Sequence, residues 1–126
     1  MAIGYEHIGK SNKARYRIIH RDHVTHENIT GYDHYPFGVH NDGRDFIITH
    51  IPTGTRISYA PQYRLAKAIM REIEGTYWMD VTFDNASQII PDEVCRYLSY
   101  GLKCPLGGFQ FRTLDDFKKE FLGVTV

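Results

Sequence analysis

Apolar and polar residues alternate over residues 14–21, with the period of two that a half-buried β-strand requires. One face would be buried and the other would display a row of guanidinium groups. We therefore predict a strand here. Its two faces carry Tyr16, Ile18 and His20 on one side and Arg15, Arg17 and Arg21 on the other.

The clearest pattern covers residues 45–59, where two apolar stretches flank the turn Pro52-Thr53-Gly54. Proline presets φ at the first turn position, and glycine accepts the left-handed conformation that closes the turn. Residues 45–51 and 55–59 are therefore predicted to form a β-hairpin.

A helical period follows this hairpin. Pro61 suits the first turn of a helix, and Gly75 offers a C-terminal cap. The apolar positions between them recur at three- and four-residue spacing, which predicts an amphipathic helix that packs on the hairpin. These positions are Leu65, Ala66, Ile69, Met70 and Ile73.

The remaining patterns predict four further elements. Alternation favours a strand over residues 77–83. A proline followed by two acidic residues indicates a short helix over residues 91–101. Two phenylalanines at alternate positions suggest a short strand over residues 109–111, and a capping-box pattern opens a last helix over residues 113–121.

Two segments have weaker patterns. Residues 1–13 are expected to be irregular, and the polar, turn-rich segment 22–43 is expected to hold one short strand around residues 35–39. No repeat, linker or low-complexity tract divides the chain. We therefore predict one α+β domain over residues 1–126, with a mainly antiparallel sheet, a central β-hairpin and about three short helices packed on it.

Composition limits the partners and the location. Fifteen Lys and Arg residues balance fifteen Asp and Glu residues, so electrostatic binding must come from a local patch. Cys95 and Cys104 lack metal-ligand spacing, which favours free thiols in a reducing compartment over a disulfide. Because the sequence shows neither a membrane-spanning apolar run nor a secretory signal pattern, we expect a cytoplasmic location.

Motifs for covalent catalysis and for nucleotide binding are missing. The chain has no G-x-S-x-G elbow, and the glycines at Gly43 and Gly107-Gly108 lack the context of a phosphate-binding loop. We assign no catalytic residue and no cofactor, and we expect a binding protein rather than an enzyme.

Basic and aromatic residues gather at the first predicted strand. Arginine can fork onto phosphates or carboxylates, and an aromatic ring can stack on an unpaired base. This strip is our candidate surface for binding protein or nucleic acid. The alternative is a solvated strand face whose charges discourage edge pairing. The strip consists of Lys10, Lys13, Arg15, Tyr16, Arg17 and Arg21.

Trp78 is a further candidate. It falls opposite Met79 and Val81 in the predicted alternation, so it lies either in a packed layer or on an exposed face. If it is exposed, its large ring would anchor a protein partner.

Three histidines recur at three-residue intervals in the segment that follows the basic strip. On a strand they point to alternate faces and on a helix they drift round, so only a loop could bring them to one metal ion. The nearby His34, His40 and Asp42 could then complete a site for metal-assisted hydrolysis. Nothing in the spacing requires this, and no metal is assigned. The candidate ligands would be His20, His23 and His26.

Residues 44–75 carry a resemblance to a known group of domains. The sequence FIITHIPTGTRI at Phe46–Ile57, followed by the helix pattern, is similar to the strand, H-x-P-T-G turn, strand and helix of small uncharacterised phage and prophage accessory domains. Such accessory proteins often bind and block a host protein or nucleic-acid machine, as anti-CRISPR and other anti-defence proteins do. The resemblance implies that context and no particular functional residue.

These observations favour a non-enzymatic binding protein, such as a phage accessory or anti-defence factor that binds a host protein or nucleoprotein complex. One alternative is a nucleic-acid-binding protein that uses the strip Lys10–Arg21. Another is a metal-dependent hydrolase that uses the histidine-rich segment 20–42. We expect no membrane partner, and an open sheet edge could pair with a second copy of the chain.

Overall fold

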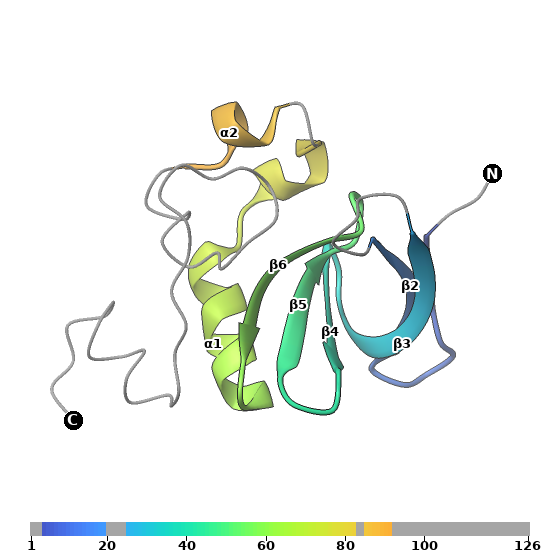
Figure 1. Ribbon diagram of the computed structural model, residues 1–126. Coiled ribbons are helices and arrows are strands. Elements are labelled where there is room, and N and C mark those ends of the chain that lie inside the picture. Colours follow the sequence, from blue (N-terminus) through green and yellow to red (C-terminus); the bar gives the residue numbers. More distant parts are fainter. Residues whose placement is uncertain (1–3, 20–24, 83–84, 92–126) are drawn as a thin grey trace, which may run out of the picture.

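The computed structural model describes residues 4–19, 25–82 and 85–91, and its main element is one six-stranded antiparallel sheet (Figure 1). The strands lie in the sheet in the same order as in the chain, which makes a continuous meander. The expectation of a mainly antiparallel sheet is confirmed. The strands are β1 (Tyr5–His7), β2 (Lys13–Ile19), β3 (His26–His34), β4 (Phe37–Asn41), β5 (Phe46–His50) and β6 (Thr55–Ala60).

The two most regular strand patterns are confirmed. In β2 the side chains of Tyr16 and Ile18 are buried, while those of Arg15 and Arg17 are exposed. Strands β5 and β6 form the predicted hairpin, and Gly54 closes its turn with a φ of 73°. A residue with a Cβ atom is strained at that φ, so glycine is the residue that the turn needs. The hairpin lies at one end of the sheet, with β6 at the edge, rather than at its centre as predicted.

Helix α1 (Tyr63–Ile73) also follows the pattern, because all five of its predicted apolar positions are buried. Its ends differ from the prediction. Gln62 is the N-cap, so Pro61 lies outside the first turn, and the helix ends at Glu74 in extended backbone. Gly75 is therefore not a left-handed cap. It makes room instead, since a Cβ atom there would lie 2.5 Å from the ring of Tyr77.

The predicted strand over residues 77–83 is wrong. Residues Thr76–Asp80 form a 3-10 helix, η1, which folds the chain back over the end of α1. The cause is the carbonyl oxygen of Ile73, which accepts hydrogen bonds from Trp78 Nε1 at 2.6 Å and from the Tyr77 hydroxyl at 3.0 Å. Alternation over so few residues does not distinguish this tight turn from a strand.

The prediction of a single short strand within residues 22–43 is also wrong, since the segment holds β3 and β4. They are joined by Tyr35-Pro36, whose peptide bond is cis. The pattern of apolar residues did not predict strand β3, because one of its faces is exposed and polar and because Gly31 occupies a buried position on the other face. The segment 1–13, expected to be irregular, contributes β1 and the first residue of β2.

The expectation of about three helices is not met in the part of the chain that the structure describes. That part contains α1, the 3-10 helix η1 and the four-residue helix α2 (Ala86–Ile89). The elements predicted over residues 91–101, 109–111 and 113–121 lie outside the described residues, as do Cys95 and Cys104. Among the described helices, none combines the length and the apolar character needed to cross a bilayer.

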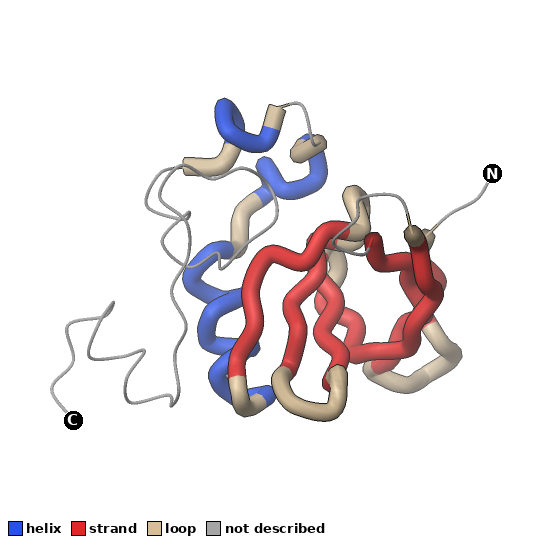
Figure 2. The backbone as a smooth tube through the Cα atoms, in the orientation of Figure 1, coloured by secondary structure: helices blue, strands red, loops and turns tan. Residues whose placement is uncertain are grey.

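The sheet curls strongly upon itself. Pairing between β3 and β4 stops beyond Tyr32 and Val39, so the first half of β3 leaves β4 and bends away. The backbone N–H of Ile19 donates a hydrogen bond of 2.8 Å to the carbonyl of Gly54, which joins the end of β2 to the β5–β6 turn. Figure 2 shows the strands bending round to enclose an interior.

This curl divides the buried residues into two cores. On the outer side of β4–β6, the sheet packs against α1 and η1. On the inner side, a smaller cluster of Ala14, Tyr16, Ile18 and Ile51 fills the enclosed space. The larger core contains Phe37, Val39, Ile48, Ile57, Ala60, Leu65, Ala66, Ile69, Met70, Ile73, Trp78, Val81 and Ile90.

The contact between Tyr16 and Gly38 can be tested by overpacking. Gly38→Ala places a Cβ atom 2.4 Å from Tyr16 Cζ, so the ring or the strand must shift. We expect the free energy of unfolding to fall by about 1–3 kcal/mol, measured by urea denaturation followed by circular dichroism. In a Tyr16→Val background the same alanine should cost much less. An equal loss of stability in both backgrounds would show that the alanine does not act through its contact with the Tyr16 ring.

Candidate binding surface

The strand register shows which side chains of β1–β3 share the outer face of the sheet. Residues paired directly across antiparallel strands point to the same side, so Glu6 and Arg15 lie together, as do Arg17 and Asn28. Helix α1 packs mainly on β5 and β6 and reaches this part of the sheet through Tyr63, which contacts Tyr32 and His34 at the end of β3. The outer residues are Glu6, Lys13, Arg15, Arg17, Ile19, His26, Asn28, Thr30, Tyr32 and His34.

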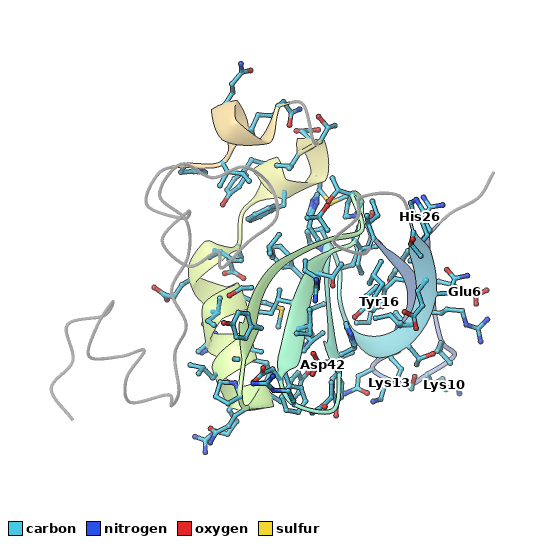
Figure 3. The ribbon with its side chains drawn as sticks, viewed as in Figure 1. Glu6, Lys10, Lys13, Tyr16, His26 and Asp42 are labelled. Carbon is cyan, nitrogen blue, oxygen red and sulfur yellow. The ribbon has the colours of Figure 1, made fainter. Side chains whose placement is uncertain are left out.

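We call the cations of this region the basic outer face, consisting of Lys10, Lys13, Arg15 and Arg17. Lys10 lies in the exposed β1–β2 turn, and the other three alternate along β2. Figure 3 shows Lys10 and Lys13 at the lower rim and Glu6 to the right. Four residues predicted from sequence are thus brought together on one exposed surface.

Among the outer residues of the described strands β1–β3, one carboxylate, that of Glu6, has a charge opposite to these cations. Glu6 Oε1 lies 3.9 Å from Arg15 Nη1, and their side chains are 71% and 62% exposed. An ion pair that is so long and so well solvated contributes little, because water screens it. Within the described residues, the positive charge of the face is therefore largely uncompensated.

Lys13 is held in place by an aromatic ring. Its Nζ lies 3.9 Å from the centroid of Tyr32, which stacks on Tyr63 at 4.1 Å with an interplanar angle of 18°. Lys67 Nζ lies 4.8 Å from the centroid of Tyr63. Lys13 and Tyr63 both pack on Tyr32, so a nucleic-acid base could stack on its ring only by displacing one of them.

The structure removes two residues from the predicted surface. Tyr16 belongs to the strip in sequence, but it points into the curled sheet and is 1% exposed (Figure 3). Trp78 is fully buried and packs edge-on against Phe37 at 5.1 Å, so the condition for its role as an exposed anchor is not met. Arg21, the last member of the strip, lies outside the described residues.

The histidines within the described residues do not converge. His26 is exposed on the outer face, His34 Nε2 makes a 2.6 Å hydrogen bond with the Tyr63 hydroxyl, and His40 faces the interior. Burial lowers the pKa of both His34 and His40. Over the described ranges, no group of three His, Cys, Asp or Glu side chains could hold a metal ion. His20 and His23 lie outside those ranges.

Asp33 is the centre of a network that sequence reasoning missed. Its Oδ2 accepts a 2.7 Å hydrogen bond from the Tyr5 hydroxyl and lies 2.5 Å from His7 Nδ1, and its Oδ1 accepts from the Tyr35 amide at 3.1 Å. The partners on β1 are more than 25 residues away in sequence, so no local pattern could reveal them. The network fastens β1, the edge of the basic outer face, to the β3–β4 turn.

This network also sets the protonation of its members. Burial by itself would raise the pKa of Asp33, but the hydrogen bonds from Tyr5 and His7 outweigh it and leave the pKa lowered. The same bond to the Asp33 carboxylate, aided by burial, raises the pKa of Tyr5 to about 12. Asp33 is thus an anion and Tyr5 a neutral donor at neutral pH.

A groove between α1 and the β3–β4 turn is a less selective surface. It has a volume of about 630 Å³, and its walls carry Lys67 and Arg71 but also Asp33 and Glu74. Because both signs of charge line it, the groove does not favour a charged ligand of one sign. The basic outer face, in contrast, favours an anionic ligand.

The Asp33 network predicts a pH-dependent contribution to stability. The folded-state pKa lies below the unfolded value, so the carboxylate stabilises the fold above about pH 4 and loses this effect as pH falls through the folded-state pKa. Asp33→Asn should lower the free energy of unfolding by about 2 kcal/mol at pH 7 and by much less near pH 2.5, measured by thermal denaturation. Asp45→Asn, in the exposed β4–β5 turn, is the matched control. A constant difference across this range would contradict the assignment.

No described protein family matches the chain, and no curated protein or solved structure is significantly similar to it. The likeness of residues 44–75 to phage accessory domains stays an expectation.

Proposed function

We propose that this protein is a non-enzymatic binding protein that docks on an anionic surface of a protein or nucleoprotein partner through its basic outer face. The observation that carries the proposal is the charge of a sheet face whose cations on β2 are not covered by any helix of the described residues. Three cations of β2 and one of the adjacent turn meet a single opposing carboxylate, Glu6, among the described outer residues of β1–β3.

The position of β2 in the sheet favours binding over a protective role. Charged side chains on an edge strand discourage pairing with other chains. Strand β2, however, is paired on both sides, by β1 and by β3, and has no free edge to protect. Edge protection therefore does not account for Arg15 and Arg17.

The geometry of the face also suits docking. Alternate residues of a strand are about 6.8 Å apart, so Lys13, Arg15 and Arg17 form a row about 14 Å long. The row stands on a strand with hydrogen-bonded neighbours on both sides, which fixes the backbone positions of the cations. Guanidinium groups held in this way can bind carboxylates or phosphates in bidentate fashion.

Direct nucleic-acid binding by the same cations is the second candidate. The outer face supports contacts with phosphates but not base stacking, since Tyr16 is buried and Tyr32 is already stacked. Such binding would be independent of sequence and strongly dependent on salt. The phage context implied by the resemblance remains part of the proposal, with a host protein or nucleoprotein as the partner.

Charge reversal on β2 tests the proposed surface. The double variant Arg15→Glu/Arg17→Glu should lose retention on immobilised heparin, a generic polyanion, and should no longer capture the partner retained by wild-type protein in affinity purification. Arg64→Glu/Arg71→Glu, on exposed positions of α1, changes the charge equally and is the control. If both double variants behave alike, the basic outer face is not the docking surface.

A salt titration separates the two partner classes. For a labelled 20-nucleotide single strand, phosphate contacts by all four cations should give a slope of log K against log salt of about −3, measured by fluorescence anisotropy. Wild-type protein that captures a protein partner but shows no such slope would support protein docking. A slope unchanged in Arg15→Glu/Arg17→Glu would exclude nucleic-acid binding by this face.

A further inference from the structure

Three buried polar groups face the interior of the curled sheet without a hydrogen-bond partner among the described residues. They are the Tyr16 hydroxyl, His40 Nδ1 and Thr49 Oγ1. Tyr16 is 1% exposed and Thr49 is fully buried. An unpaired polar group at such depth destabilises a fold, so its presence calls for a physical reason.

These groups gather around one residue, Gly38. Thr49 is the direct cross-strand neighbour of Gly38, and His40 follows it by two positions on the same face. The Tyr16 hydroxyl lies 2.8 Å from where a Cβ atom on Gly38 would stand. Side chains from β2, β4 and β5 therefore bring their free polar atoms to one part of the interior wall.

A cleft opens beside this cluster where β3 leaves β4. Its volume is about 500 Å³, which is within the range of small-molecule sites. Ile18, Ile29 and Ile47 provide apolar walls, and His40 belongs both to the cleft lining and to the polar cluster. Glu27, Asp42 and Arg56 also line the cleft.

We propose that this interior cleft binds a small uncharged molecule with an apolar body and one hydroxyl or carbonyl oxygen. The apolar body packs against the isoleucines. Of the cluster, His40 lines the cleft and Tyr16 and Thr49 do not. The oxygen therefore meets His40 first and must enter further to form hydrogen bonds with the two hydroxyls. This site is distinct from the basic outer face, because alternate residues of β2 point to opposite sides of the sheet.

The chemistry of the cluster selects an uncharged ligand. Burial lowers the pKa of His40 and raises the pKa of Tyr16, so both side chains are neutral near pH 7, as is the Thr49 hydroxyl. Each of the two hydroxyls can donate or accept a hydrogen bond, and the neutral imidazole does either according to its tautomer. The three cluster groups offer no opposite charge to a charged ligand, which would lose its hydration in the interior. At the cleft lining, an anion that approached Arg56 would also meet the carboxylates of Glu27 and Asp42, so the lining favours neither sign.

The opposite face of the sheet supplies a matched control. Thr55 is buried and its hydroxyl also has no partner among the described residues. Thr55 pairs with His50, and both lie on the face that packs toward α1 and η1. Removing this hydroxyl changes the same chemistry at a position that does not face the cleft.

The test is a titration of the isotope-labelled protein with three probes of similar size, followed by amide chemical shifts. Benzyl alcohol should produce saturable shifts at Gly38, His40 and Ile47, toluene should bind more weakly, and benzoate should not bind there. Thr49→Val should weaken benzyl alcohol binding by about three- to tenfold without affecting toluene, because one hydrogen bond is lost. Thr55→Val should change neither affinity.

Three outcomes would overturn this inference. The first is the absence of saturable shifts in the interior with benzyl alcohol. The second is equal affinity for benzyl alcohol and toluene, which would show that the polar cluster makes no contact. The third is binding of benzoate at least as tight as that of benzyl alcohol. Ile47→Phe, which fills the cleft and leaves the polar atoms in place, should abolish binding of benzyl alcohol and of toluene, and retained binding would also contradict the site.

Discussion

The ring of Tyr16 lies on two glycines of neighbouring strands, and the curl of the sheet depends on this contact. A Cβ atom on Gly38 would lie 2.4 Å from Tyr16 Cζ, and one on Gly31 would lie 2.6 Å from its hydroxyl and 2.4 Å from the carbonyl oxygen of Val39. No side chain fits at either place. Because both positions are glycine, β2 and β3 can fold over β4 and enclose a large aromatic ring where a flat sheet would leave it exposed.

The curl gives the sheet two different outer regions. Over β4–β6 the outer face carries the large apolar residues that α1 and η1 cover, with Trp78 completely enclosed. Over β1–β3 the outer face is polar and charged, and α1 contacts it through Tyr63 at the end of β3 but not along β2. The hydrogen bond from Ile19 to Gly54 closes the other end of the curl, so the enclosed space is bounded by the same strands that carry the basic outer face.

The sequence predicts the elements that are amphipathic in themselves. Strand β2, the β5–β6 hairpin and α1 each show a regular period, and each forms as expected. Strand β3 has no such period, because its outer face is solvated and Gly31 stands at a buried position where an apolar side chain would mark a strand. Its existence depends on pairing with β2, which is a tertiary property.

The candidate sites also show that a local sequence pattern predicts only residues that lie close together in the chain. Alternation alone predicts that Arg15 and Arg17 share one face of β2, and the structure confirms it. The Asp33 network joins residues that are far apart in the chain, and the cluster around Gly38 combines three strands. Trp78 was ambiguous because its burial depends on how the chain turns after α1, which the hydrogen bonds to the Ile73 carbonyl decide.

Strand β2 couples the two proposed sites through its period of two. Its odd-numbered positions 13, 15 and 17 place cations on the outer face, and its even-numbered positions 14, 16 and 18 place the ring of Tyr16 and its neighbours inside. A shift of one residue in the pairing of β2 would exchange these sets, burying guanidinium groups and exposing Tyr16. The cost of burying unpaired cations makes that shift prohibitive. The interactions that keep Tyr16 against Gly31 and Gly38 therefore also hold Arg15 and Arg17 toward solvent, so the interior contact determines which charges a partner meets.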